Sequence, residues 1–248
     1  MHLIIAGCEY SGTSTLSFAF GEWAAENMEG GAFGLNQYHD HWKLPHISNF
    51  SPPAPEDVAG VVAQFPDAKD GDYSRTGLTD EERTQIMALT PKLKEMVQRY
   101  HLQYHLHPSF YGQADHIMVG AHLDEGVLGP IYFDYGGDGQ YADRRNAMRH
   151  YEEQILEVAP DTILVLVRAS AEVIRQRMKA NPHLEGALQD KDVEQVLARF
   201  EEEYDASLLM HKVAIDTSES SVEDSASEMA EKLTPLLPEN DRKRIKNS

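Results

Sequence analysis

The chain has a single cysteine and no long apolar run, and both features limit what it can be. Cys8 has no second cysteine to pair with, so no disulfide forms within the chain, and a cytoplasmic location is expected. No apolar segment approaches the roughly 20 residues of a membrane-spanning helix. Residues 1–7 have neither a basic start nor a long apolar region, which argues against a signal peptide. We therefore expect no membrane partner.

Basic residues are scarce as well. The 248 residues include 22 Lys and Arg against 41 Asp and Glu, which gives a net charge of −19. Such a surface repels nucleic acid and anionic lipid, so we expect neither as a partner. The one basic run, residues 242–246, is interpreted as part of a flexible, solvated tail over residues 239–248.

Short apolar runs alternate with amphipathic segments along the chain. The expected strands are residues 3–6, a segment ending near Tyr38, and residues 117–121, 162–167 and 212–215. Strands that alternate with helices predict an α/β fold, a three-layer sandwich with a mostly parallel sheet. The length fits one domain over residues 1–248. Residues 51–78 are rich in Pro, Gly and Asp and begin an insertion or lid-like segment around residues 51–110.

The first expected strand leads into the loop Gly7-Cys8-Glu9-Tyr10-Ser11-Gly12-Thr13-Ser14-Thr15, and a helix is expected to start near Gly12. A glycine loop between a strand and a helix is suited to anions, because backbone N–H groups and the helix N-terminus face the ligand. The loop follows the phosphate-binding pattern G-x-x-x-x-G-K-[ST] at Gly7, Gly12 and Ser14, but Thr13 replaces the lysine. The sequence therefore predicts a phosphate or sulfate site.

The missing lysine leaves three interpretations open. Another cation takes its place, with Lys43, Arg168 and Lys179 as candidates. Alternatively, the protein binds nucleotide without efficient catalysis, or the loop serves a different anion chemistry. The lysine normally bridges the β- and γ-phosphates, and its loss removes a charge-assisted contact of about 1.5–3 kcal/mol.

Residues 4–16 resemble the first loop of the nucleoside and nucleotide kinase branch of P-loop proteins. Residues 162–178 resemble the strand and helix that lead into the kinase lid, and residues 215–218 resemble the last strand. This resemblance implies a P-loop NTPase-like fold and an ATP-dependent kinase acting on a small, nucleoside-like molecule. It places the donor phosphates of ATP on Gly7, Ser11, Gly12, Thr13, Ser14 and Thr15, and Mg²⁺ on Ser14.

The resemblance also implies roles further along the chain. Arg175 and Arg177 are candidates to contact the transferring phosphate, and Asp40 is the candidate base because His39-Asp40-His41 resembles a His-Asp-Asp element of small nucleoside kinases. Asp124 and Glu125 follow an expected strand, so either could hold the metal through water or grip a substrate hydroxyl, and helix capping is the alternative for Asp124. Arg145, which shares a helix face with Arg149, is a candidate for an acidic substrate or a solvated residue. Arg168 is a further candidate substrate contact.

Two further hypotheses stay open. Sulfotransferases share a kinase-like fold, and Gly7, Ser11, Gly12, Thr13 and Ser14 match their donor loop, with Arg168 placed like their arginine after a later strand. In that pattern, however, Tyr10 replaces a lysine and Gln176 a serine. The other hypothesis is a regulatory protein that binds nucleotide without turnover. The sequence names no acceptor and leaves the oligomeric state open between monomer and homodimer.

Overall fold

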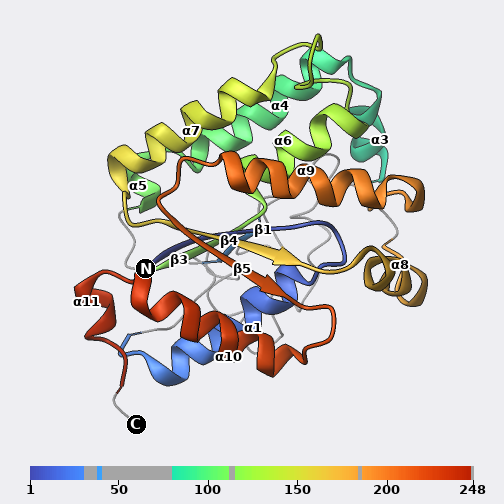
Figure 1. The fold of residues 1–248 in the computed structure, drawn as a ribbon. Coiled ribbons are helices and arrows are strands. Elements are labelled where there is room, and N and C mark those ends of the chain that lie inside the picture. Colours follow the sequence, from blue (N-terminus) through green and yellow to red (C-terminus); the bar gives the residue numbers. More distant parts are fainter. Residues whose placement is uncertain (31–37, 41–79, 112–114, 184–185, 247–248) are drawn as a thin grey trace, which may run out of the picture.

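A computed structural model of the chain describes residues 1–30, 38–40, 80–111, 115–183 and 186–246. The strands among these residues form one sheet, in which every neighbouring pair is parallel (Figure 1). The sheet order is β2 (Tyr38–Asp40), β3 (His116–Val119), β1 (His2–Ala6), β4 (Ile163–Arg168) and β5 (His211–Asp216).

The central strands β1 and β4 are apolar on both faces because helices cover both faces of the sheet. Side chains of a strand alternate between its faces, so Leu3 and Ile5 of β1 enter one core, whereas Ile4 and Ala6 enter the other. The helices are α1 (Thr13–Asn27), α3 (Asp80–Ala88), α4 (Pro91–Tyr104), α5 (Pro108–Tyr111), α6 (Ala121–Tyr132), α7 (Arg144–Val158), α8 (Ala171–Ala180), α9 (Val193–Ala206), α10 (Val222–Leu233) and α11 (Glu239–Arg242), with 3-10 turns η3 (Asp190–Asp192) and η4 (Thr234–Leu236).

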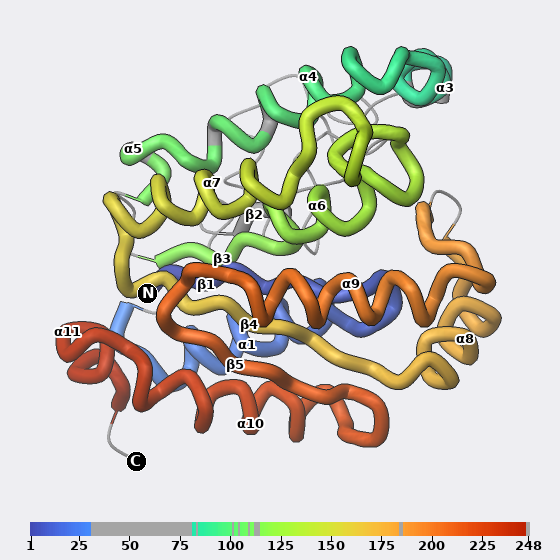
Figure 2. Tube along the Cα trace, turned by 45° about the horizontal axis from the view of Figure 1, so that its top comes forward, coloured from blue at the N-terminus to red at the C-terminus, as the bar shows by residue number. Residues whose placement is uncertain are grey.

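Helices α1 and α10 pack on one face of the sheet, and α6, α7 and α9 cover the other, with α4 beyond them (Figure 2). This arrangement confirms the three-layer α/β fold predicted from the alternating pattern. The middle strands lie close to the expected positions, because continuous apolar runs bounded by glycine or polar residues mark buried parallel strands.

The lid-like segment expected around residues 51–110 needs correction at its C-terminal part. Residues 51–79 lie outside the described residues. Beyond them, α4, the turn after it and α5 supply Leu102, Leu106 and Phe110 to the core on the α6 side of the sheet. Residues 91–110 therefore belong to the helical layer, because their apolar side chains form part of its core.

The tail also differs from the expectation. Residues 239–246 form α11 and a bridge between Ile245 and Met28, and Arg244 donates to the buried carboxylate of Asp115 at 2.8 and 2.5 Å. Burial alone raises the pKa of Asp115, but hydrogen bonds from Arg244 and the Met1 amino group lower it below its usual value. The basic run thus includes the residue that compensates a buried charge, whereas a flexible tail was expected.

None of the helices in the described ranges combines the length and the apolar character that crossing a membrane requires.

Candidate functional site

The loop after β1 opens at the centre of the carboxyl edge of the sheet. β1 lies between β3 and β4. After β1 the chain forms β2 and β3 on one side of it and then β4 and β5 on the other, so the strand order reverses at β1. In open parallel sheets, ligands bind outside the carboxyl ends of the strands, at such a reversal. Residues 7–12 occupy this position, between β1 and the first turn of α1.

Two glycines give the loop its shape. A side chain on Gly7 would place its Cβ 2.5 Å from the carbonyl oxygen of Val167, so only glycine lets the chain pass β4 here. Gly12 has a φ of 95°, in the left-handed region, and caps α1. The free N–H groups of the first turn of α1 therefore begin directly at the loop, where they favour an anion.

A cavity of about 610 Å³ lies against this loop. Residues 10–16 form one side, and residues from the end of α8, the end of β5 and the first turn of α10 form the rest. Half of the lining residues are serine or threonine, and none is aspartate or glutamate, although the chain has 41 acidic residues. The loop residues predicted to bind phosphate, Ser11 to Thr15, all line this cavity, and Gly7 lies beneath them at the exit of β1.

Arg177 of α8 joins the loop to the end of β5. Its Nη1 donates to the carbonyl oxygens of Tyr10 (2.9 Å) and Ser11 (3.3 Å), and its Nη2 donates to the carbonyl oxygen of Thr217 (2.7 Å). The Thr217 hydroxyl donates to the Ser11 carbonyl oxygen at 2.7 Å. A guanidinium therefore stands at the loop that lacks a lysine. The sequence named Arg177 as a phosphate contact but did not predict these bonds to the loop backbone.

The loop also holds the segment that follows α8. The Tyr10 hydroxyl accepts a hydrogen bond from the backbone N–H of His183 at 2.8 Å, and the two rings stack with centroids 4.1 Å apart. One oxygen of Glu9 accepts from the backbone N–H of Ala187 at 2.9 Å. Residues 183 and 187 are thereby fixed over one side of the loop, and Tyr10 and His183 both line the cavity.

The other arginine predicted for the phosphate, Arg175, lies elsewhere. It donates to Glu194 at 2.6 and 2.7 Å and to Asp190 at 2.9 Å. Hydrogen bonding to Arg175 lowers the pKa of Glu194 to about 2. The carboxylates of α9 and η3 therefore engage this guanidinium, and it is absent from the described cavity lining.

Arg168 and Arg145, both predicted substrate contacts, are also paired with acidic neighbours. Arg168 forms two hydrogen bonds with Glu201 of α9, at 2.6 and 2.5 Å, beside a smaller cavity of about 270 Å³ that Cys8 also lines. Arg145 is exposed and donates to Asp143 and Asp138. Neither arginine contributes to the described lining of the large cavity.

Glu125, the third predicted substrate contact, is buried in the helical layer. Arg144 donates to it at 2.6 Å and to Glu95 of α4 at 2.9 Å, and the Tyr135 hydroxyl donates to it at 3.2 Å. Burial raises the pKa of Glu125 despite the nearby arginine. Its carboxylate therefore bonds within the protein and does not line the large cavity, which corrects the expectation from its position after β3.

Asp124 and Asp40 were predicted for the metal and for the base. Asp124 lies in the first turn of α6 and does not line the large cavity. Asp40 ends β2 and pairs in register with Val119, the last residue of β3, so its backbone reaches the same edge of the sheet as the loop. Its side chain lies outside what the structure describes.

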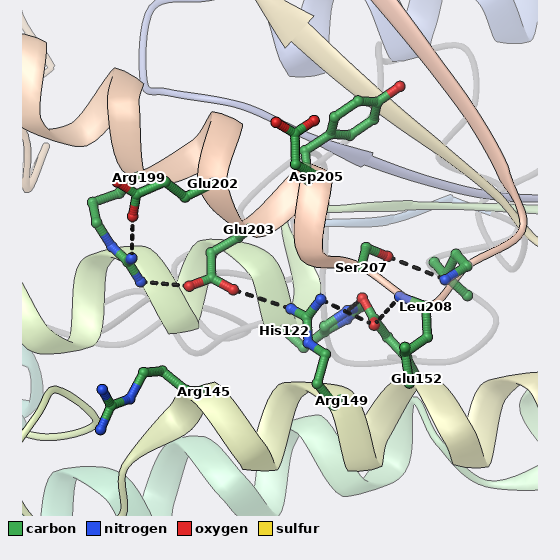
Figure 3. A network of polar contacts seen from close by, with 12 residues as sticks. His122, Arg145, Arg149, Glu152, Arg199, Glu202, Glu203, Asp205, Ser207 and Leu208 are labelled. Carbon is green, nitrogen blue, oxygen red and sulfur yellow. Dashed lines mark hydrogen bonds and ion pairs between the residues drawn. The ribbon is translucent and has the colours of Figure 1, made fainter.

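A polar network that the sequence did not indicate links α6, α7 and α9 within the helical layer (Figure 3). His122, in the first turn of α6, is 3.1 Å from Glu152 of α7, and both are buried. Glu152 also accepts from the backbone N–H of Leu208 at 2.7 Å, and Arg149 donates to Glu203 of α9 at 3.0 Å. The members of each pair are far apart in the sequence, so their spacing does not predict the contact. The fold alone brings them together.

No family model and no curated protein matches this chain. Solved structures do match in fold. The YorR protein of Bacillus subtilis in complex with phosphorylated GDP is 12% identical, with a TM-score of 0.54 over 95% of this chain and 99% of that one. Deoxyadenosine kinase from M. mycoides with bound dCTP is 16% identical, with a TM-score of 0.51 over 95% of this chain and 100% of that one.

The chain has an α/β, P-loop NTPase-like fold. The same deoxyadenosine kinase with the products dCMP and dCDP bound also matches, at 16% identity and a TM-score of 0.50. The P-loop fold agrees with the resemblance seen in the loop, although the loop lacks its lysine. At this level of identity, the similarity establishes the arrangement of the elements and not the chemistry of the site.

Proposed function

We propose that the protein binds the phosphates of ATP in the large cavity and transfers a phosphoryl group to a small molecule. The observation that carries this proposal is the composition of the cavity. It combines the N-terminal turn of α1, a row of hydroxyls and the guanidinium of Arg177, with no carboxylate among its described lining residues. Each of these groups favours an anion, and such a concentration is unusual in a chain with a net charge of −19.

Arg177 is the proposed replacement for the loop lysine. Its two Nη atoms hold the loop and the end of β5, and its Nε has no hydrogen-bond partner among the described residues. The guanidinium thus supplies positive charge at the loop while fixing the carbonyls of Tyr10 and Ser11. Phosphoryl transfer depends mainly on positioning and on stabilising negative charge, and Arg177 is placed for both.

We also propose residues for the expected Mg²⁺ and for the acceptor. The Ser14 residue of the first turn of α1 lines the cavity and would offer its hydroxyl to a magnesium ion that binds with the phosphates, where the metal would neutralise charge. Asp40 is proposed as the base that orients the acceptor hydroxyl, because β2 ends at the same edge of the sheet.

A second candidate is nucleotide binding without turnover. The observation in its favour is that Thr13 replaces the lysine while Arg177 is already bonded to the protein backbone. The sulfotransferase alternative is less favoured, because the arginine it requires, Arg168, is paired with Glu201 outside the described lining.

Titration calorimetry with ATP, with and without Mg²⁺, followed by turnover assays over a panel of nucleosides and sugars, tests the proposal. Magnesium-dependent ATP binding with phosphoryl transfer supports it. Binding without transfer to any acceptor supports the second candidate. Preferential binding of adenosine 3′,5′-bisphosphate without a Mg²⁺ requirement contradicts the kinase and favours a sulfotransferase.

A further inference from the structure

Two of the serines that line the large cavity are buried and have no hydrogen-bond partner for their hydroxyls within the described part of the chain. Ser11, in the loop, is 0% exposed, and Ser225, in the first turns of α10, is 2% exposed. Buried hydroxyls in native proteins are nearly always hydrogen-bonded, so an unpartnered one that lines a cavity points to a ligand contact.

The hydroxyl of Ser225 has no hydrogen-bond partner among the described residues, whereas that of Ser221 does. The hydroxyl of Ser221 accepts from the backbone N–H of Asp224 at 3.0 Å and donates to its side chain at 2.9 Å, so it caps α10. Ser225 lies one turn further on, where α10 packs against α1. Its backbone N–H donates to the Ser221 carbonyl oxygen, whereas its hydroxyl has no such bond.

The two ends of the cavity favour different chemical groups. Beside Ser11, the N-terminus of α1 and Arg177 favour an anion. Beside Ser225, the first turn of α10 carries Glu223 and Asp224, whose charges disfavour a second anion. A serine hydroxyl both donates and accepts, so the group that Ser225 suits is neutral and hydrogen-bonding.

We infer that Ser225 is a specificity-determining residue that hydrogen-bonds to a neutral polar group on the nucleoside half of the ligand, while the phosphates lie at residues 11–15. This inference rests on the proposed function, because it assumes that the ligand is a nucleotide. It adds that the nucleoside is recognised by a side chain of α10. The polar group belongs to the base or to the ribose, and the ligands of the test separate these two.

The test compares Ser225→Ala with Ser227→Ala, a matched change at an exposed serine of the same helix. Titration calorimetry measures the dissociation constants of ATP, GTP, 2′-deoxy-ATP and inorganic tripolyphosphate for both variants and the unmodified chain. Ser225→Ala is expected to weaken the preferred nucleotide about fivefold, the size of one hydrogen bond, and to leave tripolyphosphate binding unchanged. Ser227→Ala is expected to change neither.

If Ser225→Ala loses the preference between ATP and GTP, the base is the partner, and if it loses the preference between ATP and 2′-deoxy-ATP, the ribose is. Unchanged nucleotide binding by Ser225→Ala overturns the inference and leaves the proposed function intact. An equal loss for nucleotide and tripolyphosphate also overturns it, because the effect then concerns the phosphates. If the unmodified chain binds no nucleotide, both proposals fail together.

Discussion

Arg175 and Arg177 are two residues apart on α8, and helix geometry sends their side chains to different faces. Residues at i and i+2 do not share a helix face, so one arginine contacts the loop while the other contacts Glu194 of α9. The resemblance to kinases assigned both to the phosphate, and the helical period already argued for a single one. The same reasoning separates Arg144, which is buried, from Arg145, which is exposed.

Replacing Arg177 with alanine is expected to weaken ATP binding about 10- to 100-fold, since a bond to a charged group is lost and the carbonyls of Tyr10 and Ser11 are released. Arg177→Lys should be intermediate, because an ammonium keeps the charge but cannot bridge the loop and β5 in the same fork. Arg175→Ala, on the same helix, is the control and should bind ATP normally. Equal effects of Arg175→Ala and Arg177→Ala in calorimetry would contradict the assignment.

Glu125 is expected to make stability depend on pH above the unfolded pKa of a glutamate. Burial raises its pKa in the folded state, so its contribution to the free energy of unfolding is greatest below the unfolded value of about 4.3 and falls as pH rises toward the folded value. The pKa values of Asp115 and Glu152 are lowered in the folded state, so the stability that these two groups contribute is lost only at more acidic pH. Urea unfolding measured at rising pH above about 4.3 should therefore show declining stability, and Glu125→Gln should flatten the decline. An identical slope in both proteins would refute this account.

At the scale of elements, the pair His122 and Glu152 is expected to couple α6 with α7. Both side chains are buried, and Glu152 also accepts from the backbone N–H of Leu208. A double-mutant cycle with His122→Gln and Glu152→Gln, measured by urea unfolding, should give a coupling energy of about 1–3 kcal/mol. The exposed pair His150 and Glu153 on α7 is the matched control and should show little coupling.

The elements themselves were largely predictable, whereas the contacts between them were not. Apolar runs such as residues 163–167 mark strands because a parallel sheet buries both faces, and Gly7 and Gly12 mark the loop because of their backbone requirements. The partners of Glu125 could not be predicted, since Glu95 and Arg144 come from separate helices. The position of Glu125 shortly after β3 predicts a side chain at the edge of the sheet. Its place on α6, however, directs that side chain into the core.

The unpartnered hydroxyl of Ser225 likewise could not be predicted from the sequence. Its spacing to Met229 and Leu233 places Ser225 on the buried face of α10 and Ser227 off it, but the spacing does not indicate that this face borders a cavity. Only the packing of α10 on α1 buries one serine against the cavity and leaves the other exposed. Thr217 and His183 were missed for the same reason, since each joins the site from a separate connection.

At the scale of the whole molecule, Arg244 connects the end of the described chain to Asp115, the residue before β3. Its guanidinium compensates Asp115, which is 1% exposed. Arg244→Met should lower the free energy of unfolding by about 2 kcal/mol, because the buried carboxylate loses most of its compensation. The exposed neighbour Lys243, paired only within α11 to Glu239, provides the control Lys243→Met, which should unfold like the unmodified protein in urea. Equal stability of the two variants would argue against docking of this segment.

The contrast between the acidic molecule and its carboxylate-free cavity has a consequence for how fast a ligand arrives. An approaching polyphosphate first meets a body with a net charge of −19 and gains the attraction of Arg177 and the α1 terminus only at close range. The Debye length falls from about 10 Å at 0.1 M salt to about 3 Å at 1 M. Stopped-flow association rates for tripolyphosphate should therefore rise with added salt while dissociation also quickens. The acidic surface would then slow the entry of every polyanion, including the nucleotide proposed for the cavity.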